Sequence, residues 1–194
     1  MLFSLLLALQ DVPATAVEAE QAMERAAQTE GQWTAVRRFA APDAVVLSPQ
    51  AVPVAEAYGE PDPPRAYHWW ISDSYVSCDG RVAINTGPWE REGEYGWFTT
   101  VWKRQPDGSW AWIVDLGGST ETLLVAPMQP VTHKASCEGK APSLAFAGRG
   151  GLGGSADNSL LWQWTVTAEG RGSFHALLWT GTTFETVAKS GLRQ

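Results

Sequence analysis

The chain has 194 residues, of which 44% are hydrophobic, so it is long enough to bury one well-packed domain. Its formal net charge is −7, and its basic residues form no cluster beyond Arg37-Arg38 and Lys103-Arg104. This balance argues against nucleic acid as a partner, because little is present to neutralise a phosphate backbone. No segment reaches the ~18 apolar residues that a membrane-spanning helix requires.

Tryptophan is the main anomaly of the composition. Eleven tryptophans are more than a core of this size needs, and large rigid aromatic rings suit either a wide apolar cavity or a broad contact surface. A small apolar ligand is therefore one possible partner, and a second protein surface is the other. No sequence motif indicates a cofactor.

The first residues resemble an export signal. Leu2 to Leu9 form a short apolar segment, and Ala14-Thr15-Ala16 supplies the small residues that a signal peptidase accepts. Residues 1–16 are therefore predicted to be a signal peptide, and the mature protein is expected to be periplasmic or secreted. The alternative is an apolar first turn of a helix, because no Lys or Arg precedes the segment. The two cysteines, Cys78 and Cys137, would form one disulfide in an oxidising compartment.

Two helices are predicted next. Residues 16–30 carry alanines and Met23 at helical spacing, and Gly31 ends the run. A shorter helix follows, in which Trp33, Val36, Arg37 and Ala40 share a face. Pro42-Asp43 should stop it before a strand at residues 44–47. Residues 49–66 hold five prolines and are expected to form a loop with at most one helical turn, around residues 54–58.

The apolar period then changes to two. Residues 67–77 alternate, turn at Asp79-Gly80 and return over 82–86, which predicts a hairpin. Residues 95–104 lead into Pro106-Asp107-Gly108 and return over 109–115 as a second hairpin. Trp97, Thr99 and Val101 share one face of the outgoing strand, and Phe98, Thr100 and Trp102 share the other. Because both faces are partly apolar, we expect both to be covered.

This element order resembles the nuclear transport factor 2-like superfamily, which includes ketosteroid isomerases and small polyketide cyclases. The likeness rests on "GQWTAVRRFAAPDAVVL" (31–47) and "YGWFTTVWKRQPDGSWAWIVDLG" (95–117). It implies an α+β fold over residues 17–119, with N-terminal helices packed on a strongly curved, mostly antiparallel sheet that forms a cone. The superfamily contains enzymes, binders and oligomerisation modules. It often pairs two copies through the sheet, so a homodimer is also expected.

Asp115 has two interpretations. In the isomerase branch of the superfamily a carboxyl points into the apolar cone, where burial raises its pKa so that it exchanges a proton. Strict alternation would place Ile113 and Ala111 on its face, leaving room for a cavity. Alternatively, Asp115 ends a strand and caps a turn at Gly117-Gly118, and this ordinary turn chemistry is the favoured interpretation.

The remaining candidates are weighed in the same way. His68 is predicted either as a catalytic partner of Asp115 at the cone mouth or as a structural histidine. Asp43 is expected to cap a turn, and Tyr67 to pack at the rim. His133 and His175 are isolated, so no metal site is predicted. The expected ligand-binding residues are Trp33, Tyr58, Trp70, Asn85, Trp97 and Thr99.

The chain continues beyond this domain. Residues 120–158 are rich in Pro, Gly and Ala and are predicted to be a linker. Within it, "GRGGLG" (148–153) matches G-x-G-x-x-G, but no helix follows that would present its N-terminus to a phosphate. We interpret it as flexible linker. Residues 159–194 are predicted to be an extension built on a three-strand β meander that packs on the cone or extends its sheet.

Three functions follow from these observations. The favoured hypothesis is an exported, non-catalytic or accessory domain that binds a small apolar molecule. The second is an isomerase, dehydratase or cyclase that uses Asp115 with His68 or a tyrosine. The third is a homodimerising interaction module whose cone is filled by its own side chains. An open cone would agree with the first two hypotheses, whereas a filled cone would agree with the third.

Overall fold

The structure, a computed structural model, describes residues 12–145 and 149–192. The predicted apolar segment Leu2 to Leu9 lies outside the described residues. The signal-peptide boundary predicted at residue 16 coincides with the first residue of α1 (Ala16–Glu30), whose N-terminus is capped by Thr15. The Thr15 side chain accepts a hydrogen bond from the backbone N–H of Glu18 at 3.1 Å.

The second helix is capped from a distant loop. Gly31, with φ of 108°, separates α1 from α2 (Gln32–Phe39) and offers no side chain of its own as a cap. Asp62 fills this role, because its carboxylate accepts hydrogen bonds from the backbone N–H groups of Trp33 and Thr34. A side chain on Gly31 would clash with the Asp62 carboxyl, 2.6 Å from the position of a Cβ. Through Asp62, this loop therefore caps one helix of the cone.

The predicted helices and hairpins are confirmed, with changes at their ends. The helix α2 ends at Phe39, and the next strand already begins at Ala40, so Pro42-Asp43 lies inside an irregular part of a strand instead of before it. The predicted turn of helix is α3 (Val54–Ala57). The strands of the large sheet are β1 (Ala40–Leu47), β2 (Ala51–Pro53), β3 (His68–Trp69), β4 (Asp73–Val76), β5 (Val82–Arg91), β6 (Glu94–Arg104), β7 (Trp110–Thr120) and β8 (Val131–Lys134).

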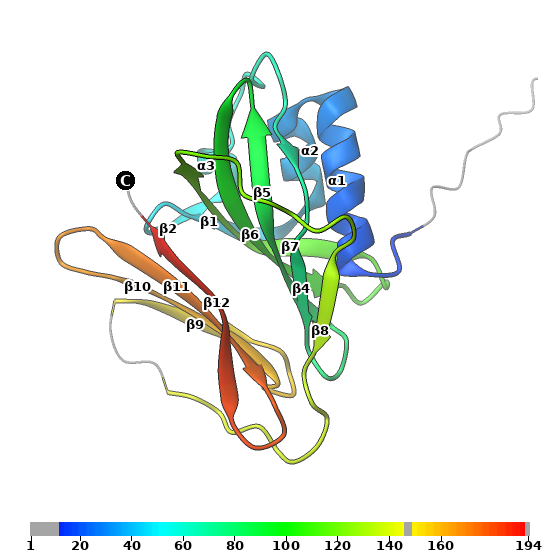
Figure 1. Ribbon diagram of the computed structural model, residues 1–194, viewed down its shortest axis with the longest axis vertical. Helices are drawn as coiled ribbons and strands as arrows, with labels where there is room; N and C mark the ends of the chain where they lie inside the picture. Colours follow the sequence, from blue (N-terminus) through cyan, green and yellow to red (C-terminus); the bar gives the residue numbers. More distant parts are fainter. Residues whose placement is uncertain (1–11, 146–148, 193–194) are drawn as a thin grey trace, which may run out of the picture.

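The large sheet is mixed and strongly curved. Its order is β2-β1-β7-β6-β5-β4-β8, with β3 also paired to β5. The central hairpins are antiparallel, whereas β1 pairs with β7 and β4 pairs with β8 in parallel. Helices α1 and α2 cover one side of this sheet, which we call the inner face (Figure 1). Sheet and helices together form the cone.

The C-terminal extension is a separate sheet of four strands, one more than predicted. It consists of β9 (Gly150–Gly154), β10 (Leu160–Val166), β11 (Gly172–Trp179) and β12 (Phe184–Leu192), in the order β12-β11-β10-β9. The expectation that the described part of "GRGGLG" is flexible linker is therefore wrong. Gly150, Gly151 and Gly153 of this motif belong to β9, where the rings of Trp162 and Trp164 occupy the positions that Cβ atoms on Gly153 and Gly151 would take.

This second sheet packs on the other side of the large sheet, which we call the outer face (Figure 1). Leu160, Phe174 and Ala176 are fully buried in this interface. They meet the outward side chains of the central strands, among them Ile84 and Val101. The apolar outer face is thus covered within one chain. The homodimer stays a prediction, but the uncovered sheet face on which it rested is not exposed in this structure.

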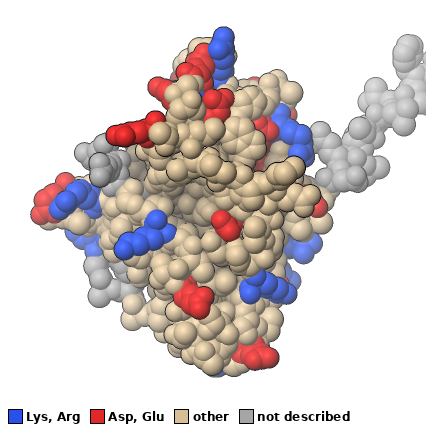
Figure 2. All heavy atoms as spheres, viewed as in Figure 1, with Lys and Arg blue, Asp and Glu red and all other residues tan. Residues whose placement is uncertain are grey.

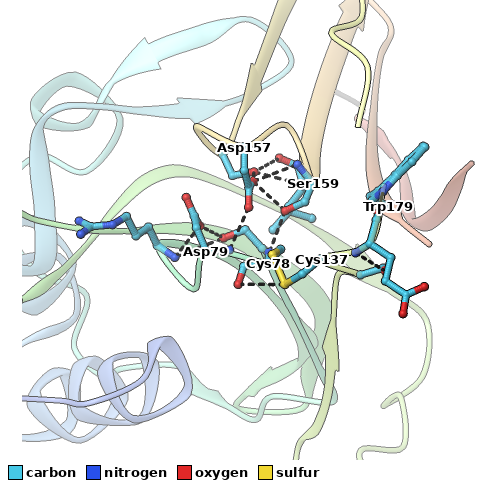
Figure 3. Close-up of a disulfide and its surroundings, with 12 residues drawn as sticks. Cys78, Asp79, Cys137, Asp157, Ser159 and Trp179 are labelled. Atoms are coloured by element: carbon cyan, nitrogen blue, oxygen red, sulfur yellow. Dashed lines mark hydrogen bonds between the residues drawn. A yellow bond between two sulfur atoms is a disulfide. The ribbon is translucent and has the colours of Figure 1, made fainter. Parts of the chain in front are cut away.

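A disulfide lies where the two sheets meet, and a group of hydrogen bonds beside it joins them (Figure 3). Cys78 and Cys137 are bonded, as predicted. Next to this bond, the backbone N–H of Cys78 donates to Ser159 Oγ at 2.7 Å, and the N–H of Asp79 donates to Asp157 Oδ2 at 2.9 Å. Burial works to raise the pKa of Asp157, but the hydrogen bonds from Ser155, Ser159 and the backbone together hold it below its usual range.

The surface carries charges of both signs. On the face seen in Figure 2, Lys and Arg side chains lie apart from one another, interspersed with Asp and Glu. Among the described residues, no helix is both long and apolar enough to cross a membrane.

Candidate ligand-binding site in the cone

The inner face encloses a cavity of about 510 Å³, a size typical of small-molecule sites. Its walls come from α1, α2, the loop around α3 and the central strands. Aromatic rings dominate the lining, including Trp33, Tyr67, Trp89, Phe98 and Trp112. This cavity does not fit the third hypothesis, in which the protein's own side chains fill the cone.

Asp115 lies in this cavity and not at a strand end. The strand β7 continues through Gly117 and Gly118, which pair with Phe98 and Trp97 of β6, so there is no turn for Asp115 to cap. The favoured turn-capping interpretation is thus wrong, and the alternative of an inward carboxyl describes the position of Asp115. Burial raises its pKa, against the opposing effect of hydrogen bonds from Tyr58, Thr100 and the backbone of Leu116.

The face shared with Asp115 also differs from the prediction. A β-bulge interrupts the β6–β7 register, so that Val101 pairs with Val114 but Trp102 pairs with Trp112. The extra residue, Ile113, shifts the alternation, and Trp112 rather than a small side chain lines the cavity beside Asp115. The predicted side chains at positions 111 and 113 therefore do not line the cavity, whereas Gly117 and Gly118 further along β7 do.

Two hydroxyl groups hold the Asp115 carboxyl. Tyr58 donates its hydroxyl to Oδ2 at 2.5 Å, and Thr100 donates to Oδ1 at 3.0 Å. The Tyr58 ring is fixed by stacking on Trp33, with ring centroids 4.6 Å apart. Arg37 of α2 donates to the Tyr58 carbonyl oxygen at 2.6 Å. Burial, followed by the charge of Asp115, raises the pKa of Tyr58 well above its usual range, so Tyr58 stays a protonated donor.

A second acid in the cavity, Glu20, was missed from the sequence. Glu20 projects from α1, is 1% exposed, and accepts hydrogen bonds from three neutral donors. Trp69 Nε1 donates to Oε1 at 3.0 Å, while Trp102 Nε1 and Asn85 Nδ2 donate to Oε2 at 2.6 and 3.3 Å. Burial, assisted by repulsion from Asp115, outweighs these bonds and raises the pKa of Glu20 to about 7.

The signal for Glu20 was present in the helix period. Glu20 follows Ala16 by four residues and precedes Met23 by three, so it lies on the buried face of α1. An acid at an apolar helical position is the pattern that would have identified it.

The other predicted site residues divide into three groups. Trp33 and Tyr58 line the cavity, and Asn85 lies behind it as a donor to Glu20. Trp97 and Thr99 lie on the outer face, with Trp97 packed against the second sheet. Trp70 is 45% exposed and does not line the cavity.

His68 and Asp115 are not brought together. His68 lies at the surface, where its Nδ1 is 3.1 Å from Glu24 Oε1. Asp43 is exposed, whereas Tyr67 lines the cavity. His133 is 2.8 Å from Asp73 on the edge strands of the sheet. Within residues 12–145 and 149–192, no group of three or more His, Cys, Asp and Glu side chains is placed to hold a metal ion.

Comparisons with known proteins found structural likeness at low sequence identity. One solved structure, described as a putative ketosteroid isomerase from Parabacteroides distasonis, is 16% identical, covers 58% of this chain and 93% of its own, and has a TM-score of 0.46. Another, an NTF-2-like protein of unknown function from Burkholderia xenovorans, is 16% identical, covers 57% of this chain and 86% of its own, and has a TM-score of 0.38. No protein-family model and no curated protein matches the chain.

Proposed function

We propose that this protein binds a small, largely apolar molecule inside the cone and holds the polar group of that molecule at Asp115, Tyr58 and Glu20. The observation that carries the proposal is an aromatic cavity of about 510 Å³ with two buried acids in its wall. Buried carboxyl groups are costly, and a fold has no structural need to place two of them beside an open space. The Cys78–Cys137 disulfide supports an oxidising location outside the cytoplasm.

A cavity-filling substitution tests this proposal. Val52 on β2 lines the cavity, whereas the preceding residue, Ala51, is exposed. Val52→Trp places a ring in the space that a ligand would occupy. For any molecule found by a thermal-shift screen of small apolar compounds, we expect Val52→Trp to weaken binding at least ~10-fold.

The matched control is Ala51→Trp, which adds the same side chain on the same strand but outside the cavity. It should leave affinity within about twofold. If Val52→Trp folds and binds as tightly as the unsubstituted protein, the ligand does not occupy the cone and the proposal fails.

A second candidate function is proton transfer on the bound molecule, with Asp115 as the acid or base and Tyr58 as its partner. The specific observation in its favour is that Asp115 has a raised pKa and touches both a tyrosine hydroxyl and the cavity. Of the two partners that the sequence suggested for Asp115, His68 or a tyrosine, this candidate uses the tyrosine. The non-catalytic binder remains the first proposal, because no ligand geometry defines a reacting atom.

The substitution Asp115→Asn separates the two candidates. Both hydroxyl partners of Asp115 can reverse their hydrogen bonds, so the amide should fit without unfolding the site. A catalytic carboxyl predicts a loss of turnover of ~10²-fold or more with the melting temperature nearly unchanged. The control is Asp43→Asn at the surface. Unchanged turnover in Asp115→Asn, for any activity found by screening, would remove the catalytic assignment.

A further inference from the structure

The polar groups that face the cavity are mainly hydrogen-bond acceptors. A carboxylate offers about four acceptor positions. Glu20 receives three donors, from Trp69, Trp102 and Asn85. Asp115 likewise receives two hydroxyl groups and the backbone N–H of Leu116. Each carboxyl therefore keeps an acceptor position, and a ligand that supplies donors would complete both.

None of the donors that the protein supplies to these acids carries a charge. Among the described residues that line the cavity, there is no Lys, Arg or His. The guanidinium of Arg37 on α2 is engaged with the carbonyl oxygens of Tyr58 and Gly59 and with Glu60. The cavity thus holds two acids without a counter-charge. A buried carboxylate is stable only when it is paired or protonated, so a cation bound in the cavity would stabilise the ionised form of both acids.

The walls of the cavity suit a cation as well. Aromatic faces attract positive charge through the ring quadrupole, and tryptophan does so most strongly. Trp33, Trp69, Trp89 and Trp112 all contribute to the lining. Trp33 is further ordered by stacking with Tyr58, and Trp89 meets Tyr67 edge to face at 4.9 Å. Rigid rings around buried acids favour an organic cation over a hydrated metal ion, because rings offer no oxygen ligands.

We infer that the ligand of this cavity is an apolar molecule bearing a protonated amine, whose ammonium group binds in reach of Glu20 and Asp115 while its apolar body packs on the tryptophans. This inference rests on the proposed function and narrows its ligand class. An ammonium group supplies up to three N–H donors, which matches the acceptor positions left on the two carboxyl groups.

The inference fixes the direction of the pH dependence. The titratable groups around the cavity are Glu20 on α1, Tyr58 after α3, Tyr67 before β3 and Asp115 on β7. An ammonium ligand binds the ionised carboxylates, so it lowers their pKa and releases protons. Its affinity should therefore rise as the pH increases from 5 to 8, through the pKa of Glu20 at about 7. The affinity of a neutral ligand of the same shape should not rise with pH in this range.

Matched amine and alcohol probes test the inference on the full-length protein. The pairs are benzylammonium with benzyl alcohol, naphthylmethylammonium with naphthylmethanol, and adamantylmethylammonium with adamantylmethanol, each titrated by calorimetry at pH 8 and pH 5. For the best-fitting pair, we expect the ammonium to bind at least tenfold more tightly than the alcohol at pH 8. We also expect this preference to shrink at pH 5, with proton release measurable in buffers of different ionisation heat.

Substitutions of the two acids test whether their negative charges cause the preference for the ammonium probe. Glu20→Gln and Asp115→Asn should each reduce the ammonium preference at least threefold, while alcohol binding changes less. The control Glu185→Gln removes an exposed negative charge on β12, outside the cavity, and should leave the preference unchanged.

The outcomes are distinct. Equal binding of amine and alcohol at both pH values would leave the small-molecule function standing and overturn the cationic class. An equal loss of preference in Glu185→Gln would attribute it to net charge and would also overturn the inference. Binding of no member of any pair, by unsubstituted protein with an unchanged melting temperature, would overturn the proposed function and this inference together.

Discussion

The two faces of the same three strands differ in what they bury. Towards the second sheet, β5, β6 and β7 present Ile84, Val101 and Val114, all apolar and packed on other apolar side chains. Towards the helices, alternate residues of these strands present Asn85, Thr100 and Asp115, which are hydrogen-bonded next to a cavity. The backbone pairing of these strands is shared by both faces, so the difference between the faces lies in their side chains. At these positions the outer face buries apolar side chains, whereas the inner face buries polar groups, which are more costly to bury.

The largest effect should come from damage to the outer face. Phe174 is fully buried between the two sheets, so Phe174→Ala leaves a cavity there. We expect a loss of about 4 kcal/mol in the free energy of unfolding, measured by urea denaturation. Phe184→Ala, at a half-buried phenylalanine of β12, should cost no more than about 2 kcal/mol. Equal costs at the two positions would mean that the interface between the sheets is not the well-packed region described above.

A smaller effect should mark the inner face and depend on pH. The folded-state pKa of Glu20, about 7, lies above its unfolded value of 4.5, so the folded protein binds more protons than the unfolded protein in this range. The stabilisation from this proton is present below pH 4.5 and is lost as the pH rises through 7. Between pH 5 and pH 8, the unsubstituted protein should lose roughly 2–3 kcal/mol more stability than Glu20→Gln. Parallel stability curves for the two proteins would show that Glu20 ionises normally.

The smallest effects on the free energy of unfolding should come from polar-to-apolar and apolar-to-polar substitutions at two neighbouring residues of β6, Thr100 and Val101. Val101→Thr places a hydroxyl in the apolar interface without a partner, and should cost about 2 kcal/mol. Thr100→Val removes one hydrogen bond to Asp115 at nearly constant shape, and should cost about 1 kcal/mol. Chemical denaturation of both variants compares the two faces directly. A larger cost for Thr100→Val would contradict this contrast between the two faces.

Local patterns were enough to predict most elements of the cone. The helical period of residues 16–30 and the alternation around Pro106-Asp107-Gly108 both gave elements of the right kind, since each depends on residues close in sequence. The disulfide was predictable because only two cysteines exist. The curvature of the sheet was predicted from the resemblance to a known superfamily and not from the local pattern of residues.

The site was harder to predict because it depends on non-local geometry. The bulge at Ile113 leaves no mark in an alternating sequence, yet it decides that Trp112 lies beside Asp115. The strand β9 contains four glycines among its five residues, and only the rings of Trp162 and Trp164 from a neighbouring strand explain it. Pairings of this kind are visible only once the sheets are assembled.

The parallel pairing of β1 with β7 has a consequence for the order of folding. The strand β1 is formed from residues 40–47, but its partner β7 lies far later in the chain. In this pairing Val46 aligns with Asp115. Antiparallel hairpins between β4 and β7 can form from neighbouring residues, whereas the β1–β7 contact must close a long loop and is entropically slower. We therefore expect the hairpins to form early and β1, with its helices, to join them last. Glu20 belongs to the part that joins last and Asp115 to the part that forms early. The cavity between them is therefore complete only in the fully folded protein, and a molecule that binds there would bind only that state.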